Sequence, residues 1–179
     1  MTTIARVALL GPMGIGKTTA IRAVCGNLAV DCDVPNLDIT RHSKVTTTVG
    51  ADFGEVDLGD GDKMQLYGCP GQDRFDFVRQ WVLSSAVGAF VLADLNESEA
   101  ADETALLLDE IAISPCSPLP VVLIARPAAG EQINRFTRAL EQRGKGLVPV
   151  LQADVRDRQQ MLDMLQVLVS MLSLKEASA

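Results

Sequence analysis

The sequence has 179 residues, of which 47% are apolar and 22% are charged, values close to those of ordinary globular proteins. A chain of this length can bury the core of one domain, and we expect residues 1–179 to form a single domain. The net charge of −7 offers no general attraction to nucleic acid, and the apolar runs stay below the roughly 18 residues of a membrane span. We therefore expect no nucleic-acid partner and no integral membrane segment.

Short β-rich apolar segments alternate with helix-period segments along the chain. The expected strands are residues 4–10, 52–58, 64–67, 89–94, 120–125 and 147–151. The expected helices are residues 17–27, 72–86, 97–113, 131–143 and 157–174. This alternation is typical of an α/β fold with a six-stranded, mostly parallel sheet and helices on both faces.

One pair of strands departs from the alternation. Residues 52–58 and 64–67 are separated only by Gly59-Asp60-Gly61-Asp62, a composition typical of a tight turn. This spacing predicts an antiparallel hairpin at one edge of the sheet. The last helix, residues 157–174, has a broad apolar face that we expect to cover the sheet, with a partner-binding helix as the second interpretation.

The segment between the first strand and the first helix carries the clearest motif. Gly11 to Thr18 reads Gly-Pro-Met-Gly-Ile-Gly-Lys-Thr and matches the phosphate-binding pattern Gly-x-x-x-x-Gly-Lys-[Ser/Thr]. Its glycines permit backbone turns that a side chain would block. Lys17 can reach the outer phosphates, and the Thr18 hydroxyl can ligate magnesium. Backbone amides that we expect around the phosphates belong to Gly11, Met13, Gly14, Ile15, Gly16, Lys17, Thr18 and Thr19.

Two further segments carry a specific resemblance. Residues 46–54 read Thr-Thr-Thr-Val-Gly-Ala-Asp-Phe-Gly, and residues 66–75 read Leu-Tyr-Gly-Cys-Pro-Gly-Gln-Asp-Arg-Phe. They resemble the Thr-Ile-Gly-Val-Asp-Phe and Leu-Trp-Asp-Thr-Ala-Gly-Gln-Glu-Arg-Phe segments of Rab-type small GTPases. The proline before Gly-Gln is closer still to bacterial and archaeal small GTPases of the MglA-like group. The resemblance covers about residues 4–160 and implies a Ras-like P-loop NTPase fold.

The resemblance implies roles for individual residues. Thr48 would ligate magnesium together with Thr18, although three consecutive threonines suit an edge strand equally well. The Gly71 amide would contact the γ-phosphate, and Gln72 would orient the attacking water. Lys17 and Gln72 are therefore the candidate catalytic residues, with Mg²⁺ and GTP or GDP as the cofactors. Arg41 is a candidate internal arginine finger, or else a solvated loop side chain.

The helix expected over residues 72–86, which begins within the second of these segments, is unusually apolar at its start. Core packing explains most of these residues, and a surface for regulators and effectors is the second interpretation. For the MglA-like group, the resemblance suggests a Roadblock-type dimer as regulator. The apolar helix residues are Phe75, Phe77, Val78, Trp81 and Val82.

The four cysteines lack zinc-site spacing and follow no secretory signal, so we expect reduced thiols and a cytoplasmic location.

Two positions depart from the family pattern. Gly68 stands where small GTPases carry the magnesium-binding aspartate of Asp-x-x-Gly, so magnesium should be held more weakly or through water. Residues 125–128 read Ala-Arg-Pro-Ala where the guanine-reading Asn-Lys-x-Asp is expected. Guanine specificity therefore does not follow from the sequence, and ATP stays an alternative ligand. Arg126 can still stack on a base.

The segment Asp154-Val155-Arg156 aligns with the last base-binding motif of the family. Asp154 is a candidate acceptor for the base edge, and a helix cap is the other interpretation.

Three functions remain open. The leading one is a nucleotide switch with slow GTP hydrolysis, used in signalling. The others are a non-hydrolysing nucleotide-binding scaffold and a small-molecule kinase, which would need an arginine-rich lid.

Overall fold

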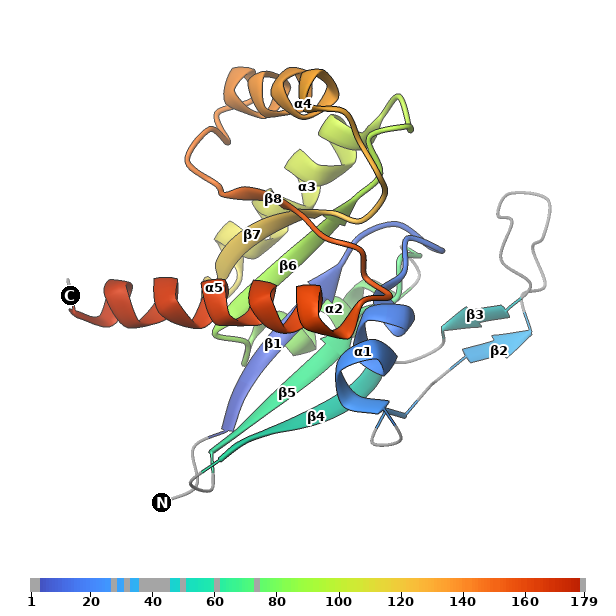
Figure 1. Ribbon diagram of the computed structural model, residues 1–179, viewed down its shortest axis with the longest axis vertical. Coiled ribbons are helices and arrows are strands. Elements are labelled where there is room, and N and C mark those ends of the chain that lie inside the picture. The colour runs from blue at the N-terminus through green and yellow to red at the C-terminus, as the bar shows by residue number, and fades with distance from the viewer. Residues whose placement is uncertain are drawn as a thin grey trace.

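The computed structural model describes residues 4–26, 29–30, 33–35, 46–48, 51–59, 62–72 and 75–177. A six-stranded sheet with the strand order β4-β5-β1-β6-β7-β8 forms its centre (Figure 1). β4 and β5 are antiparallel at one edge, and every other neighbouring pair in this sheet is parallel. The predicted α/β architecture is therefore confirmed. Its strands are β1 (Ile4–Leu10), β4 (Asp52–Gly59), β5 (Asp62–Gly68), β6 (Gly88–Ala93), β7 (Leu119–Ile124) and β8 (Val150–Gln152).

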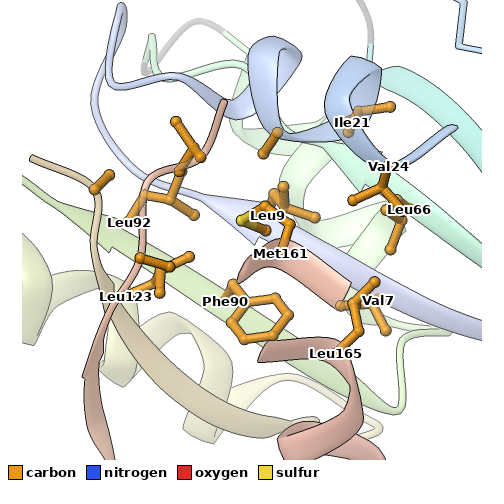
Figure 2. Close-up of a cluster of buried hydrophobic side chains, with 14 of the residues drawn as sticks. Val7, Leu9, Ile21, Val24, Leu66, Phe90, Leu92, Leu123, Met161 and Leu165 are labelled. Carbon is orange, nitrogen blue, oxygen red and sulfur yellow. The ribbon is translucent and has the colours of Figure 1, made fainter. Parts of the chain in front are cut away.

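Helices cover both faces of this sheet. Alternate residues of β1 point to opposite faces, so Val7 and Leu9 enter one apolar cluster while Ala8 and Leu10 enter another. α1 (Lys17–Cys25) and α5 (Arg158–Ala177) pack on the Leu9 side, which Figure 2 shows around Phe90. α2 (Asp76–Leu83), α3 (Ala100–Ile113) and α4 (Gly130–Gln142) pack on the opposite side.

Three details differ from the expectations. A separate antiparallel pair, β2 (Asp33–Pro35) with β3 (Thr46–Thr48), was not among the six expected strands, although an edge strand was one interpretation of the three threonines. The helix expected over residues 72–86 is observed as α2 from Asp76 to Leu83; before it, the Phe75 amide donates to the Gln72 carbonyl oxygen, and residues 73–74 lie outside the described residues. The last strand begins at Val150 rather than at residue 147, since Pro149 has no amide hydrogen for the ladder.

Among the residues that the structure describes, no helix combines the length and apolar content that a membrane crossing needs. Cys25, Cys69 and Cys116 are free thiols, and Cys32 lies outside the described residues. Burial raises the pKa of the Cys69 thiol to about 12, despite nearby Lys17 and Arg79, so this cysteine stays protonated and unreactive.

Candidate functional site

The loop that follows β1 takes its shape from three glycines. Gly11, Gly14 and Gly16 have φ values of 138°, 80° and 117°, which lie in the left-handed region that L side chains rarely adopt. Packing adds a second constraint at two of them. A Cβ atom on Gly11 would lie 2.6 Å from the Leu92 carbonyl oxygen, and one on Gly16 would lie 2.9 Å from Val155 Cγ2. The loop therefore closes against β6 and the segment after β8 only with glycine at these positions.

Lys17 begins α1 and folds back over the loop. Its Nζ donates to the carbonyl oxygens of Gly11 at 2.7 Å and Pro12 at 2.8 Å, and the residue is 9% exposed. Gly16 is the N-cap of α1, and no side chain caps this helix. The positive end of the helix and an ammonium group thus meet at the loop, an arrangement that suits a polyphosphate anion.

Thr18 lies beside a buried carboxylate that the sequence analysis missed. Its hydroxyl donates a short hydrogen bond to Asp52 Oδ2, and Asp52 is 1% exposed at the start of β4. Asp52 pairs across the hairpin with Gly68, the position that lacks the family aspartate. A Cβ atom on Gly68 would lie 3.6 Å from Asp52 Oδ2. β4 therefore places the Asp52 carboxylate next to Gly68, the position where small GTPases carry the aspartate of Asp-x-x-Gly.

Gly71 and Gln72 lie against the same loop, and their roles toward the γ-phosphate and the attacking water stay predictions. A Cβ atom on Gly71 would lie 2.6 Å from the Met13 amide nitrogen, so only a glycine permits this approach. Gln72 Nε2 lies 3.3 Å from Met13 Sδ, and Gln72 Oε1 is buried without a hydrogen-bond partner among the residues that the structure describes. An unsatisfied buried acceptor costs about 1–3 kcal/mol, so this oxygen favours a donor such as a water molecule.

A cavity of ≈660 Å³ opens on the other side of the loop. Gly14, Gly16 and Thr19 line it from the loop and α1, and the segments after β7 and β8 complete it. Its position at the carboxyl ends of parallel strands is the usual ligand site of such sheets. The structure thus brings three predicted residues to this cavity, namely Arg126, Asp154 and Val155.

Arg126 reaches across the cavity to the phosphate loop. Nη2 donates to the Gly14 carbonyl oxygen at 3.1 Å, and Nη1 donates to the carbonyl oxygen of Ala125 at 3.1 Å. Nε lies 4.0 Å from Asp94 Oδ2. These contacts fix the guanidinium plane at the cavity wall, where it can stack on a planar ring.

The carboxylate of Asp154, which lines the cavity, is already hydrogen-bonded to Arg156. Its Oδ1 accepts from the backbone amide and Nε of Arg156, both at 2.9 Å, and its Oδ2 accepts from Arg156 Nη2 at 2.7 Å. These side-chain and backbone hydrogen bonds lower the pKa of Asp154 to about 2, so it is ionised at neutral pH. The alternative role of helix cap falls to Asp157, whose Oδ1 accepts the Gln160 amide at 3.1 Å in the first turn of α5.

The other predicted residues differ in how far the structure places them. Ile15 is buried in the core beneath the loop, and its backbone follows the loop. Thr48 lies in β3, where its backbone pairs with Asp33, and its role as a magnesium ligand stays a prediction. Arg41 lies outside the described residues. The sequence analysis missed Asp52 because its position next to Gly68 depends on the register between two strands. Counting residues outward from the predicted hairpin turn could have placed Asp52 near Gly68.

The strand order, the glycine loop between β1 and α1, and the cavity beyond that loop define a P-loop NTPase fold. No family model matches the sequence. The sequence is 30% identical over 128 residues to Ras-related protein Rab-32 of Homo sapiens, covering 67% of this chain and 52% of Rab-32. It is 28% identical over 92 residues to an uncharacterized protein of Methanocaldococcus jannaschii, covering 51% of this chain and 52% of that protein.

The fold is also similar to that of a larger solved protein. It matches bacterial selenocysteine-specific elongation factor EF-Sec with a TM-score of 0.67 and 16% identity, over 98% of this chain and 29% of that chain. The chain spans about half the length of the curated relatives it matches. The solved structure supports the fold alone, and the sequence similarity to Rab proteins supports a small GTPase in general. Membership of the MglA-like group stays a prediction.

Proposed function

We propose that this chain is a single-domain, magnesium-dependent molecular switch that binds GTP or GDP and hydrolyses GTP slowly. One observation carries the proposal: Lys17, the Thr18–Asp52 pair and the Gly71–Gln72 segment all surround the same phosphate loop. Each of these groups has a use with a nucleoside triphosphate. The ammonium and the loop amides bind phosphate oxygens, and the remaining groups face the region that the outer phosphates would occupy.

Thr18 and Asp52 suit a magnesium ion. Magnesium prefers oxygen ligands, and in nucleotide sites it uses one or two carboxylates together with phosphate oxygens and water. A buried carboxylate beside a hydroxyl provides such a donor set, and Thr48 is a further candidate ligand. When bound, the ion would neutralise charge that develops on the β- and γ-phosphates.

Gly71 and Gln72 suit the γ-phosphate and the attacking water. The tight approach of Gly71 to Met13 keeps its backbone beside the loop, where an amide can meet the outermost phosphate. The unsatisfied Gln72 Oε1 is a ready acceptor for a hydrogen of that water. Loss of the γ-phosphate on hydrolysis would remove the contact that holds this segment, which is the basis of a switch.

A second candidate is a nucleotide-binding scaffold with relaxed base specificity, for which ATP is also a ligand. It is favoured by the base side of the site, where Ala125 and Ala128 replace the guanine-reading side chains. The carboxylate of Asp154 is engaged by Arg156, which weakens it as a substitute for the missing acceptor. Arg126 would stack on any purine and would not discriminate between them.

Partner binding forms part of the proposal. Phe77 and Trp81 on α2 are 66% and 61% exposed, and Tyr67 packs edge-on against Trp81. Exposed aromatic side chains of this kind are common in protein interfaces. We therefore assign a regulator, such as a Roadblock-type dimer, and an effector to this surface, with signalling in the cytoplasm as the setting.

A binding panel tests the proposal. Calorimetry with GTP, GDP, ATP and ADP, each with magnesium, should show saturable binding, tightest for the guanine nucleotides. Equal affinity for guanine and adenine nucleotides would favour the scaffold, and absence of heat with any triphosphate at millimolar concentration would refute both candidates. Phosphate release under multiple-turnover conditions then separates a hydrolysing switch from a scaffold.

A further inference from the structure

Arg79 on α2 is a buried guanidinium that joins three parts of the molecule. Its side chain is 7% exposed. On α3, Glu110 accepts from Arg79 Nε at 2.8 Å and from Nη2 at 3.1 Å. Nη2 also donates to Asp76 Oδ1 at 2.6 Å, and Nη1 donates to the Pro70 carbonyl oxygen at 3.4 Å. One side chain therefore ties α2 to α3 and to the segment that follows β5.

The Pro70 carbonyl is part of the peptide bond that leads into Gly71. Gly71 approaches the Met13 amide so closely that a Cβ atom would lie 2.6 Å from it. Arg79 and Glu110 also line a cavity of ≈170 Å³ that is bounded by Gly71 and by the phosphate loop. A shift of the guanidinium would therefore move the Pro70–Gly71 peptide relative to that loop.

The strength of this connection follows from burial. An exposed ion pair contributes little, but a buried guanidinium that loses its carboxylate leaves an uncompensated charge. Burial alone would lower the pKa of Arg79, yet the hydrogen bond and charge of Glu110, with the charge of Asp76, raise it above its usual range. The guanidinium thus stays charged, and its fork geometry holds two helices and a backbone carbonyl at once.

We propose that Arg79 is a positioning residue that sets the preference of the site for a nucleoside triphosphate over the diphosphate. The inference rests on the proposed function. Both nucleotides share the contacts of the phosphate loop, and they differ in the γ-phosphate, for which the Gly71 amide is the candidate donor. Arg79 holds the Pro70–Gly71 peptide in place before the nucleotide binds, so binding does not pay the entropic cost of ordering it. Only the triphosphate contacts this peptide, so only triphosphate affinity increases.

The test compares two nucleotides on three variants. Affinities for GDP and for a non-hydrolysable GTP analogue are measured with magnesium on wild type, Arg79→Gln and Glu110→Gln. If the calorimetry shows tighter binding of adenine nucleotides, ADP and a non-hydrolysable ATP analogue replace them. Arg143→Gln is a matched control. Arg143 donates to Asp102 Oδ1 on α3 from Nε at 2.8 Å and from Nη2 at 2.6 Å, and to the Ala139 carbonyl oxygen on α4 at 2.8 Å. These partners lie on α3 and α4, whereas Arg79 also reaches the segment before Gly71.

We expect Arg79→Gln to weaken triphosphate binding by about tenfold or more, while diphosphate affinity stays within about twofold of wild type. Glu110→Gln should shift the ratio in the same direction, and Arg143→Gln should leave it unchanged. A purely structural role would weaken both nucleotides alike and would overturn the inference, as would an unchanged ratio. Should Arg79→Gln fail to fold, Glu110→Gln decides by the same criterion. A wild-type chain that binds neither nucleotide would instead overturn the proposed function itself.

Discussion

Replacing Asp52 with asparagine tests the carboxylate beside the phosphate loop. Asparagine keeps the shape of the side chain and an oxygen that can accept the Thr18 hydrogen bond, so the fold should survive. It removes the negative charge, which is the property that a magnesium ion needs from Asp52. Hydrogen bonds and contacts that involve a charged group contribute about 1.5–3 kcal/mol, which corresponds to roughly 10- to 100-fold in affinity.

The assay compares nucleotide affinity in magnesium with affinity in a chelator. The wild-type ratio of the two affinities measures how much the ion contributes. We expect Asp52→Asn to reduce this ratio by about tenfold or more and to leave the affinity in chelator nearly unchanged. Glu55→Gln is the control, because Glu55 lies on the same strand but binds Lys63 Nζ at 2.6 Å, away from the loop.

The hairpin also offers a rescue. A Cβ atom on Gly68 would lie 3.4 Å from Asp52 Cβ and 3.0 Å from the flexible end of Ile21, so a Cβ atom is accommodated there with a small adjustment. Gly68→Asp in the Asp52→Asn background should therefore recover part of the magnesium ratio. In the wild-type background it would place two carboxylates side by side and should lower stability. An Asp52→Asn variant with the wild-type ratio would refute the assignment of Asp52 to magnesium.

Three further predictions concern single residues. Lys17→Ala should abolish saturable nucleotide binding in calorimetry, because it removes the ammonium held at the loop. Gln72→Ala should leave binding unchanged but slow single-turnover hydrolysis by about tenfold or more, and an unchanged rate would exclude a catalytic role. Because hydrogen bonds from Arg156 lower the pKa of Asp154 from 3.8 to about 2, the pair stabilises the fold above the usual pKa, and that stability is lost as pH falls toward about 2. Urea unfolding between about pH 2 and about pH 5 should thus show a shallower acid decline for Arg156→Gln.

Local patterns predicted most of the fold because they match their surroundings in the structure. The second half of β1, from Val7 to Leu10, and the whole of β6 are continuous apolar runs, as expected of strands buried on both faces. The glycine-rich turn after β4 predicted the one antiparallel pair of the main sheet. Where the prediction was wrong, local chemistry competed with the pattern. Before β8, the Val148 amide bonds to the Lys145 carbonyl oxygen in a turn, and Pro149 has no amide hydrogen for the ladder.

The parts of the site that could not be predicted depend on contacts between distant residues. An arginine in the middle of a helix normally indicates a solvated face, and only the fold brings Arg79 to Glu110, 31 residues away. Asp52 in an edge strand likewise gives no local sign of Thr18, which lies 34 positions earlier. By contrast, the loop from Gly11 to Thr18 could be picked out from the sequence, because the phosphate binding proposed for it needs only consecutive backbone amides and two side chains.

Under the proposed function, the two sides of the site differ in what they would recognise. The phosphate side combines a helix terminus, the Lys17 ammonium and the Gly71 backbone, groups that respond to a polyphosphate tail shared by all nucleoside triphosphates. The base side relies on Arg126, a stacking surface common to purines, and on a carboxylate already engaged by Arg156. Affinity then arises mainly from the tail, while discrimination between bases arises from paired polar contacts that residues 125–128 no longer supply. If the proposed function holds, the γ-phosphate is the group to which the Gly71–Gln72 segment would respond, and the base would have less influence on that segment than the phosphate tail.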